Sequence, residues 1–303
     1  MMELSTFQNR IGDLLPNLEL RYNESMAKHT SFRIGGAAEV MVFPKNSDEL
    51  AEVLKISALL DCNCAILGAG TNVLAPDEGI AGVVVCLRDC LDGISLQEGN
   101  RLWVAAGVTM TRAAVFAANH GLSGLEFAHG IPGTVGGGVY MNAGAYGGEI
   151  CQVCQQVSVM DRNGVVKTLS NEEMEFSYRH SCLENSDKIV LGVVFQLTPK
   201  APEEIKSCMR QLMEKRSASQ PLDLPSAGSA FKRPTGGYAA ALIEQAGLKG
   251  FRVGNAAVSE KHAGFVVNLG NATAADVKAL LQQVSERVLA HSGIQLHPEV
   301  RIW

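Results

Sequence analysis

The chain of 303 residues contains no apolar run approaching the roughly 20 residues that a membrane-spanning helix needs. The N-terminal segment MMELSTFQNR has neither a basic start nor an apolar core, so no signal peptide is expected. Positive charge is not in excess either, because 26 Lys and Arg stand against 31 Asp and Glu. The net charge of −5 disfavours extensive nucleic-acid binding. These absences predict a cytoplasmic protein with no membrane insertion and no nucleic-acid partner.

A recognisable metal-binding pattern is also lacking. The chain has eight cysteines, which without an export signal indicate reduced thiols. The CQVC segment, Cys151 to Cys154, has no second cysteine pair or histidines at the spacing that a zinc site needs, so we expect no metal. Two unrelated buried thiols or a redox pair remain the alternatives for this segment.

The first part of the chain alternates between strand and helix patterns. Residues 39–43 read as a strand, and apolar residues at helical spacing predict a helix over 47–60, with Ser47 as its cap. Short apolar runs at 64–67 and 83–87 read as further strands. This order is typical of a βαβ unit, which predicts a partly parallel sheet with a helix on one face.

The remainder of the chain divides into a strand-rich region and a more helical one. Strands predominate between 102 and 198, interrupted by one helix near 110–120. Farther along, helices are expected from Pro202 onward, over 238–246 and after a cap at Thr273. A chain of this length with these patterns predicts two or three domains: a first α/β domain, a middle glycine-rich α+β domain and a last α/β domain.

The segment GIPGTVGGGVYMNAGAYG, residues 130–147, is unusually rich in glycine. Flexible linkers and tight turns are the ordinary explanations for such a run. Apolar residues such as Ile131, Val135 and Val139 are not typical of a linker, however. Glycine also loses more backbone entropy on folding than other residues. We therefore interpret the segment as ordered backbone that packs closely against a ligand.

A second glycine segment, LGAGTNVL at 67–74, follows a predicted strand, as a dinucleotide fingerprint would. Val73 stands where the third glycine of G-x-G-x-x-G is required, so a Rossmann motif is disfavoured. Gly70, Thr71 and Asn72 instead favour an anion-binding turn built from backbone amides, a hydroxyl and an amide side chain.

Two neutral glycine-lined cradles would suit one long diphosphate ligand. Neither segment ends in the Lys-Ser/Thr pair of a nucleotide-hydrolysing P-loop, so phosphoryl transfer is not expected.

Several segments occur in a characteristic order: LGAGTNVL, GLSGLEFAHGIPGTVGGGVYMNAGAYG, SYRHS, SAGSAFKRP, KHAGFVVNLG and HPEVRIW. Together they resemble the UDP-N-acetylenolpyruvoylglucosamine reductase family, from about Thr30 to the C-terminus. Each motif alone is modest, but the ordered set is specific. The family consists of flavoproteins of bacterial peptidoglycan synthesis that make UDP-N-acetylmuramate.

The resemblance implies an α+β fold with a vanillyl-alcohol-oxidase-type FAD-binding region of two α+β subdomains and a C-terminal α/β substrate domain. It places the first FAD-binding subdomain at 1–87 with 296–303, the second at 88–200 and the substrate domain at 201–295. The short span from Arg179 to Lys188 resembles the short form of the family, which lacks an extra substrate-covering loop.

The resemblance also implies FAD as cofactor and NADPH as hydride donor. The 130–147 segment holds no histidine or cysteine, so non-covalent FAD binding is expected, although His129 lies just outside it. The implied cofactor-binding residues are Gly68, Ala69, Gly70, Thr71, Asn72, Ile131, Gly133, Thr134, Gly137, Gly144, Arg216, Gly228 and Arg301.

Three residues match the catalytic positions of the family. Reduction of an enolpyruvyl ether adds hydride to the methylene carbon and a proton to the carbon that bears the carboxylate, so the site must stabilise negative charge and deliver a proton. Arg179 matches the catalytic arginine, Ser229 the proton donor and Glu299 the third catalytic position. The alternatives are a surface arginine, a turn serine and a Glu299–Arg301 ion pair that closes a final strand.

The resemblance further implies UDP-N-acetylglucosamine enolpyruvate as substrate and a monomeric enzyme. Tyr178, Lys232, Arg233 and Lys261 are the implied substrate-binding residues, and the three cations suit a UDP diphosphate. A solvated basic face is the alternative reading of the cations. Rival functions are an oxidase on the same fold or a nucleotide-binding protein without catalysis.

Overall fold

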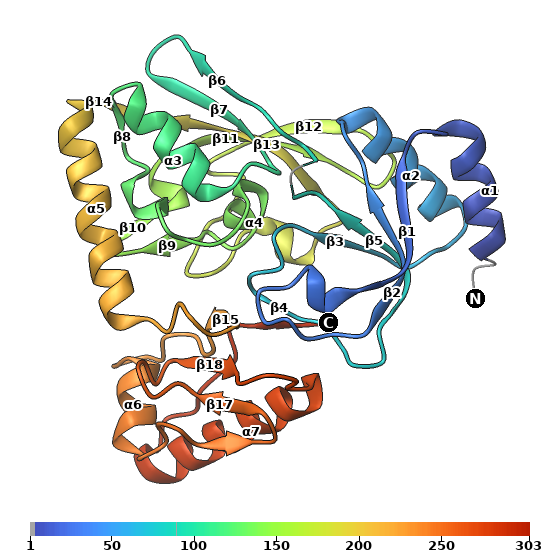
Figure 1. Cartoon of the computed structure of the whole chain (residues 1–303). Coiled ribbons are helices and arrows are strands. Elements are labelled where there is room, and N and C mark those ends of the chain that lie inside the picture. The colour runs from blue at the N-terminus through green and yellow to red at the C-terminus, as the bar shows by residue number, and fades with distance from the viewer. Residues whose placement is uncertain (1–3, 89) are drawn as a thin grey trace. The chain divides into compact units, whose positions relative to one another are not determined.

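The computed structural model describes residues 4–88 and 90–303, which form two compact units (Figure 1). Unit 1 contains the N-terminal segment to Tyr22, Val40–Ala69 and Ala81–Lys215. Unit 2 contains Asn23–Glu39, Gly70–Ile80 and Arg216–Trp303. Each unit therefore combines stretches that are distant in the sequence. The finer division into three domains, with boundaries after 87 and 200, stays a prediction.

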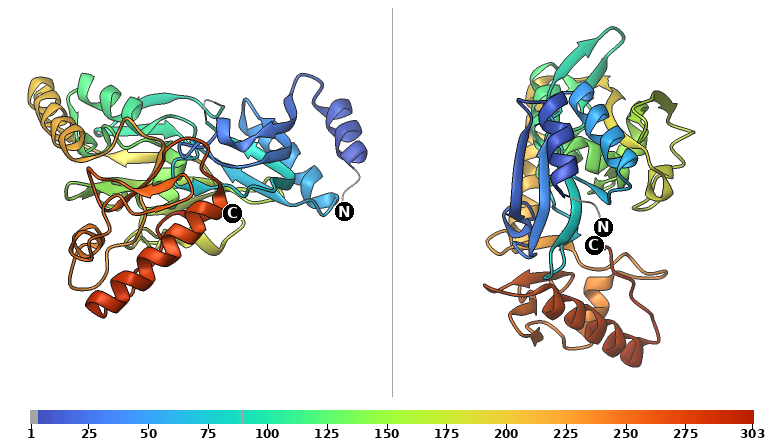
Figure 2. Two further views of the ribbon diagram at one scale, coloured as in Figure 1. Left: turned by 60° about the horizontal axis from the view of Figure 1, so that its bottom comes forward. Right: turned by 90° about the vertical axis from the view of Figure 1, so that its right-hand side faces the viewer.

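The first part of unit 1 is a four-stranded sheet with two helices beside each other (Figure 2). Its strands lie in the order β1-β2-β5-β3, and β3 runs parallel to β5, with Cys64 opposite Val83. The elements are α1 (Leu4–Leu14), β1 (Glu19–Ser25), β2 (Ala37–Phe43), α2 (Ser47–Leu59), β3 (Cys64–Leu67) and β5 (Ile80–Cys86). The predicted strand–helix–strand order with a parallel strand pair is confirmed, whereas α1 and β1 were not predicted.

Helix α2 matches the prediction except at its cap. The side chain of Asn46, rather than Ser47, accepts hydrogen bonds from the backbone N–H groups of Asp48 and Glu49. Asn46 has an extended backbone (φ −153°), which aims its amide oxygen at the first helical turn. Ser47 is already the first helical residue, so the expectation of a Ser47 cap is wrong by one position.

The second part of unit 1 is a five-stranded antiparallel sheet in the order β12-β11-β13-β7-β6. Its strands are β6 (Ile94–Gln97), β7 (Arg101–Ala105), β11 (Cys154–Met160), β12 (Val166–Ser170) and β13 (Ile189–Gln196). Helix α3 (Met110–Asn119) and two short strand pairs accompany it: β8 (Leu122–Ser123) with β14 (Thr198–Pro199), and β9 (Gly144–Ala145) with β10 (Gly148–Glu149). The strand-rich region and its helix near 110–120 are confirmed, but the prediction of a single helix there is wrong, because the structure holds a second one.

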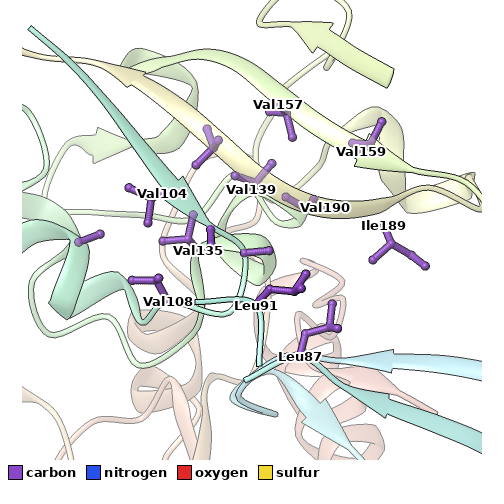
Figure 3. Close-up of a cluster of buried hydrophobic side chains, with 14 of the residues drawn as sticks. Leu87, Leu91, Val104, Val108, Val135, Val139, Val157, Val159, Ile189 and Val190 are labelled. Carbon is purple, nitrogen blue, oxygen red and sulfur yellow. The ribbon is translucent and has the colours of Figure 1, made fainter. Parts of the chain in front are cut away.

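The glycine-rich segment contains a short helix, α4 (Val135–Tyr140), which sequence periodicity did not reveal. Val135 and Val139 of α4 are fully buried and lie among Val104, Val157 and Val190 of the five-stranded sheet (Figure 3). Apolar anchors thus fix the glycine-rich backbone in the core of unit 1. The expectation that this segment is ordered rather than a linker is confirmed.

Unit 2 is built on a second antiparallel sheet in the order β15-β18-β17-β16, against which α7 packs (Figures 1 and 2). A parallel pair, β4 with β19, joins two distant segments. The elements are β4 (Val73–Leu74), β15 (Ser226–Ser229), α6 (Ala239–Gln245), β16 (Arg252–Val253), β17 (Ala256–Val258), β18 (Phe265–Asn268), α7 (Ala274–Ser292) and β19 (Arg301–Ile302). Helices were predicted at the positions of α6 and α7, and both are present.

Helix α5 (Pro202–Ser219) also begins at its predicted proline and buries Ile205 and Met209. No helix within the described ranges 4–88 and 90–303 combines the length and the apolar character needed to cross a bilayer.

The N-terminus of α7 is held by two side chains. Thr273 and Asp276 form a capping box, in which the backbone N–H of Thr273 holds the pKa of Asp276 below its usual value. In addition, the carboxylate of Asp77 accepts the N–H groups of Ala274 at 2.7 Å and Ala275 at 3.0 Å. Asp77 therefore connects the 70–80 segment to α7.

We expect Asp77→Ala to lower the free energy of unfolding by about 1–2 kcal/mol, because two helix N–H groups lose their acceptor. Urea unfolding measures the difference. Glu78→Ala is the matched control, since Glu78 is the adjacent exposed carboxylate. Equal losses in the two variants would show that the Asp77 bonds contribute nothing.

Candidate active site

In unit 1 the two glycine segments predicted from the sequence meet at one point. A Cβ atom added at Gly68 would lie 2.6 Å from the hydroxyl oxygen of Thr134, so the turn after β3 packs directly on the residue that precedes α4. Gly68 and Ala69 are both half-buried. The two segments are therefore in contact at Gly68 and Thr134 within one unit, and their role as cradles for a ligand stays a prediction.

The backbone N–H groups at the start of α4 donate hydrogen bonds to other groups of the protein. Thr134 is buried and accepts a long hydrogen bond of 3.4 Å from the Gly137 N–H. The N–H of Val135 donates to Val108 O at 2.8 Å, and that of Gly136 donates to Ala106 O at 2.9 Å. These two N–H groups already bind protein carbonyls, so they are not available to a ligand.

Three consecutive glycines of α4 have different surroundings. A Cβ at Gly136 would lie 2.9 Å from the Cβ of Ala106, and one at Gly138 would lie 2.8 Å from Met110 Sδ. Among the described residues, a Cβ at Gly137 would meet only the Thr134 hydroxyl oxygen, at 3.5 Å. Packing therefore explains glycine at 136 and 138, whereas Gly137 is exposed and accessible to a ligand.

The other predicted residues of this segment serve neighbouring loops. Ile131 is half-buried against the core, and the carbonyl of Gly133 accepts the Met110 N–H at 3.0 Å. Gly144 pairs with Glu149 across a two-residue strand pair, where a Cβ would lie only 2.7 Å from Gly148 O. Glycine is required at 144 by this close approach.

Arg179 lies in a tight turn whose ends are bonded to each other. The Ser177 N–H donates to His180 O and the His180 N–H to Ser177 O, which leaves Tyr178 and Arg179 at the tip. Arg179 has φ +56°, a left-handed conformation that is uncommon for a residue with a side chain. Its Nη2 donates to Gly144 O at 3.2 Å, and its guanidinium lies 5.1 Å from the Tyr178 ring centroid.

Strained backbone that the surroundings hold in place is concentrated at functional sites, so this conformation supports a functional role for Arg179. Tyr178 is exposed beside it.

One buried residue of unit 1 was missed by sequence reasoning. The side chain of Asn142 is 1% exposed and forms hydrogen bonds to Ser177, Glu149 and Cys151. An asparagine in a glycine-rich run reads as an ordinary turn residue. No local signal identifies its partners, because Ser177 lies 35 residues away.

In unit 2, Ser229 stands at an irregularity in its strand. It ends β15 opposite Phe265, and the pairing register shifts between Ser226 and Ser229. Gly228 has φ +76° and permits this bulge, since glycine adopts positive φ without strain. Ser229 is exposed.

The structure brings Ser229 and Glu299 onto neighbouring backbone segments. The Glu299 N–H donates to Ala230 O at 2.9 Å, and the Lys232 N–H donates to His297 O at 2.9 Å. Glu299 is half-buried. HPEVRIW is not one continuous strand: it first pairs with residues 230–232 and then with β4, so regular strand geometry is confined to Arg301–Ile302.

The first glycine segment continues into unit 2 beside Glu299. Gly70 has φ +62°, and a Cβ there would lie 2.1 Å from His29 O, so protein packing alone requires this glycine. Asn72 Nδ2 donates to Glu299 O at 3.2 Å, and Asn72 O accepts the Arg301 N–H at 2.9 Å. Asn72, adjoining Thr71, thus holds the backbone on both sides of residue 300.

The remaining predicted cations of unit 2 contact protein groups. Arg216 is buried and donates to Gln220 Oε1 at 3.1 Å, while Lys261 Nζ donates to Ser217 O at 2.7 Å. The Arg233 guanidinium lies 4.6 Å from the ring centroid of exposed Tyr238. Lys232 is half-buried.

The CQVC cysteines are free thiols in unit 1. Burial, with a smaller contribution from Cys151, raises the pKa of Cys154 to about 12, and the Cys151 thiol donates to Glu149 Oε1 at 3.2 Å. The pKa of Cys151 is raised as well, and thiols with a raised pKa are poor nucleophiles, which disfavours a redox pair. Cys154 is buried as expected, whereas Cys151 is only half-buried. Within the described part of the chain, no group of three or more His, Cys, Asp or Glu side chains could hold a metal ion.

Comparison with known proteins finds a family match for two parts of the chain. Residues 38–170 match a family model described as FAD binding domain, and residues 220–303 match one described as UDP-N-acetylenolpyruvoylglucosamine reductase, C-terminal domain. The UDP-N-acetylenolpyruvoylglucosamine reductase of Agathobacter rectalis is 45% identical over 308 aligned residues, covering 98% of each protein.

Comparison with solved structures agrees with these sequence matches. A crystal structure of UDP-N-acetylenolpyruvylglucosamine reductase from Thermus caldophilus is 34% identical with a TM-score of 0.79, covering 95% of this chain and 99% of that one. An alkyldihydroxyacetonephosphate synthase, at 14% identity, shares the fold alone, with a TM-score of 0.50 over 65% of this chain and 41% of its own. The α+β fold of the vanillyl-alcohol-oxidase type is confirmed.

The surroundings of the α4 glycines generate a prediction for the ligand-free protein. Gly136→Ala should lower the free energy of unfolding by about 1–3 kcal/mol, because the new methyl group meets Ala106. Gly137→Ala should preserve stability or raise it by up to about 1 kcal/mol, since alanine is the better helix former. Denaturant unfolding of both variants tests the assignment, and equal destabilisation would contradict it.

Proposed function

The chain belongs to the UDP-N-acetylenolpyruvoylglucosamine reductase family, and from this premise we propose the reaction and the residues that perform it. The protein is an FAD-dependent oxidoreductase that uses NADPH to reduce the enolpyruvyl group of UDP-N-acetylglucosamine enolpyruvate, forming UDP-N-acetylmuramate for peptidoglycan synthesis. The observation that carries this function is 45% identity across 98% of both chains.

Residues of unit 1 fit the cofactor. The diphosphate of FAD needs backbone that a bulky anion can approach closely, and exposed Gly137 beside Thr134 and Gly68 provides it. We assign Gly68, Ala69, Thr134 and Gly137 as FAD contacts in this unit. Ile131, Gly133 and Gly144 support the surrounding backbone. The other sequence-predicted FAD contacts, which include Gly228 and Arg301, stay predictions.

Bound FAD supplies the hydride, which originates from NADPH. Arg179 binds the carboxylate of the enolpyruvyl group, where its planar guanidinium can donate two parallel hydrogen bonds. Negative charge moves into this carboxylate as the methylene carbon accepts hydride. A cation already held in place stabilises that charge without reorganisation, and the strained turn together with the Gly144 bond provides such holding.

Ser229 donates its hydroxyl proton to the carbon that bears the carboxylate. Its exposure at a bulge gives a substrate access to Oγ. Glu299 is the third catalytic group, and the hydrogen bond from its N–H to Ala230 O fixes its backbone relative to the serine. Lys232, Arg233 and Lys261, with Tyr178, are the residues that we assign to the UDP-sugar substrate.

We further propose that the enzyme works as a monomer in the cytoplasm. Size-exclusion chromatography with light scattering tests the oligomeric state, and a dimer mass would overturn this part alone.

Absorbance of the purified protein under anaerobic conditions tests the function. The protein should be yellow, should be bleached by NADPH, and should regain its colour rapidly with the enolpyruvyl substrate but slowly with air. Recolouring that is faster with oxygen than with the substrate would indicate an oxidase, and a colourless protein would overturn the proposal.

The cofactor is expected to be attached non-covalently. Denaturation in acid should therefore release all flavin from the wild-type protein, and flavin that stays with the precipitate would contradict this.

The exposure of Gly137 leads to a separate prediction for cofactor binding. Gly137→Val should fold yet lose most of its flavin, since a branched side chain at this exposed position would hold the diphosphate away from the backbone. The 450-nm flavin absorbance per folded protein measures this loss. Wild-type flavin content in folded Gly137→Val would limit this glycine to a structural role.

The role of Ser229 predicts a difference between the two half-reactions. Ser229→Ala should leave bleaching by NADPH intact but slow recolouring by the substrate by about 10²–10⁴-fold, the usual contribution of a general acid. Ser229→Cys should recover part of the rate, because a thiol can also donate a proton. Ser226→Ala on the same strand is the control and should behave as wild type. Equal slowing of both half-reactions in Ser229→Ala would exclude the serine as proton donor.

A further inference from the structure

We propose that Asn142 is a positioning residue that holds the Arg179 turn in its working geometry; this proposal rests on the function proposed above. Asn142 lies just beyond the end of α4, is 1% exposed and has φ +42°. Asparagine tolerates this left-handed conformation better than most residues with side chains. Its side chain is therefore fixed by both backbone and burial.

The amide of Asn142 binds both segments that determine where Arg179 lies. Its Nδ2 donates to Ser177 O at 3.1 Å, and Ser177 forms one end of the turn that carries Arg179 at its tip. Its Oδ1 accepts the Cys151 N–H at 2.9 Å, which fixes the loop that follows β9 and β10. That strand pair contains Gly144, whose carbonyl accepts Arg179 Nη2.

One buried side chain thus connects the base of the arginine turn to the strand pair that receives the guanidinium.

The side chain at 142 must both donate and accept hydrogen bonds, which an amide does. Nδ2 also donates to Glu149 Oε2 at 3.3 Å, so the donor end of the amide faces a carbonyl and a carboxylate. An aspartate at 142 would place a second negative charge against both acceptors. Loss of a single partner in such a buried network costs more than its bond alone, because the remaining polar groups are left unsatisfied.

Two variants separate positioning from folding. Asn142→Gly removes the amide and keeps the left-handed backbone without strain. Asn142→Asp keeps the acceptor for Cys151 but cannot donate to Ser177. Asn171→Ala is the matched control, because Asn171 Nδ2 holds the same loop through Cys151 O at 2.8 Å and Cys154 O at 2.7 Å, two bonds that do not reach the arginine turn.

The first readout is independent of catalysis. Phenylglyoxal modifies accessible arginines, and peptide mass spectrometry measures the rate at Arg179. If the turn is released, Arg179 should react several-fold faster in Asn142→Gly and in Asn142→Asp than in wild type or Asn171→Ala. Unchanged reactivity of Arg179 in folded, flavin-loaded Asn142 variants would overturn the positioning role. Faster reactivity in the control as well would assign the effect to general loosening of the loop and would also overturn it.

The second readout links positioning to the reaction. In Asn142→Gly the substrate half-reaction should slow by about 10- to 100-fold, as expected for a misplaced catalytic group, while bleaching by NADPH is unchanged. In an Arg179→Lys background the same change should have little further effect, because two residues that act through one contact are not additive. Equal slowing in both backgrounds would overturn the proposal. Released Arg179 without any slowing would preserve the positioning role but refute the catalytic role of Arg179.

Discussion

The close approach of α4 to the residues that follow β7 is the constraint on which the candidate site residues of unit 1 depend. Gly136 lies so near Ala106 that no Cβ fits, and its N–H is bonded to the Ala106 carbonyl. Val135 and Val139 are fully buried in the same apolar core cluster as Ala106. Because α4 is fixed this tightly, Gly137 is held exposed and Asn142 is placed in the interior, although neither contributes to the apolar core.

Elements whose signals are local were predictable from the sequence. The helix that starts at Pro202 and the Thr273–Asp276 capping box are specified by residues within one or two turns, and both are present. Strands β7, β11, β12 and β13 of the five-stranded sheet lie in the region predicted to be rich in strands, whereas β6 precedes it and was not predicted. Even here a one-residue ambiguity remained at Asn46 and Ser47, since either side chain can cap and only the backbone conformation decides between them.

The individual roles of glycines and asparagines could not be predicted, because they are set by partners far along the chain. Nothing in LGAGTNVL shows that Gly70 is needed by the His29 carbonyl, or that the side chain of Asn72 binds Glu299, 227 residues away. Motif resemblance selected these segments without distinguishing ligand contacts from packing. Local patterns report backbone preference and burial, whereas such distinctions require the non-local neighbours.

The same non-local bonds explain why the Ser229–Glu299 region depends on more than the C-terminal part of the chain. The matched C-terminal family region begins at residue 220, yet unit 2 also contains Asn23–Glu39 and Gly70–Ile80. Ser31 Oγ donates to Ser226 O at 2.6 Å, and Asn72 holds the Glu299 carbonyl. The strand that ends at Ser229 and the segment that carries Glu299 are therefore each fixed by residues from the N-terminal quarter of the chain. It follows that the geometry of the Ser229–Glu299 region depends on the 23–39 and 70–80 segments as well as on the C-terminal part of the chain, and that changes in those segments act on this region through backbone position.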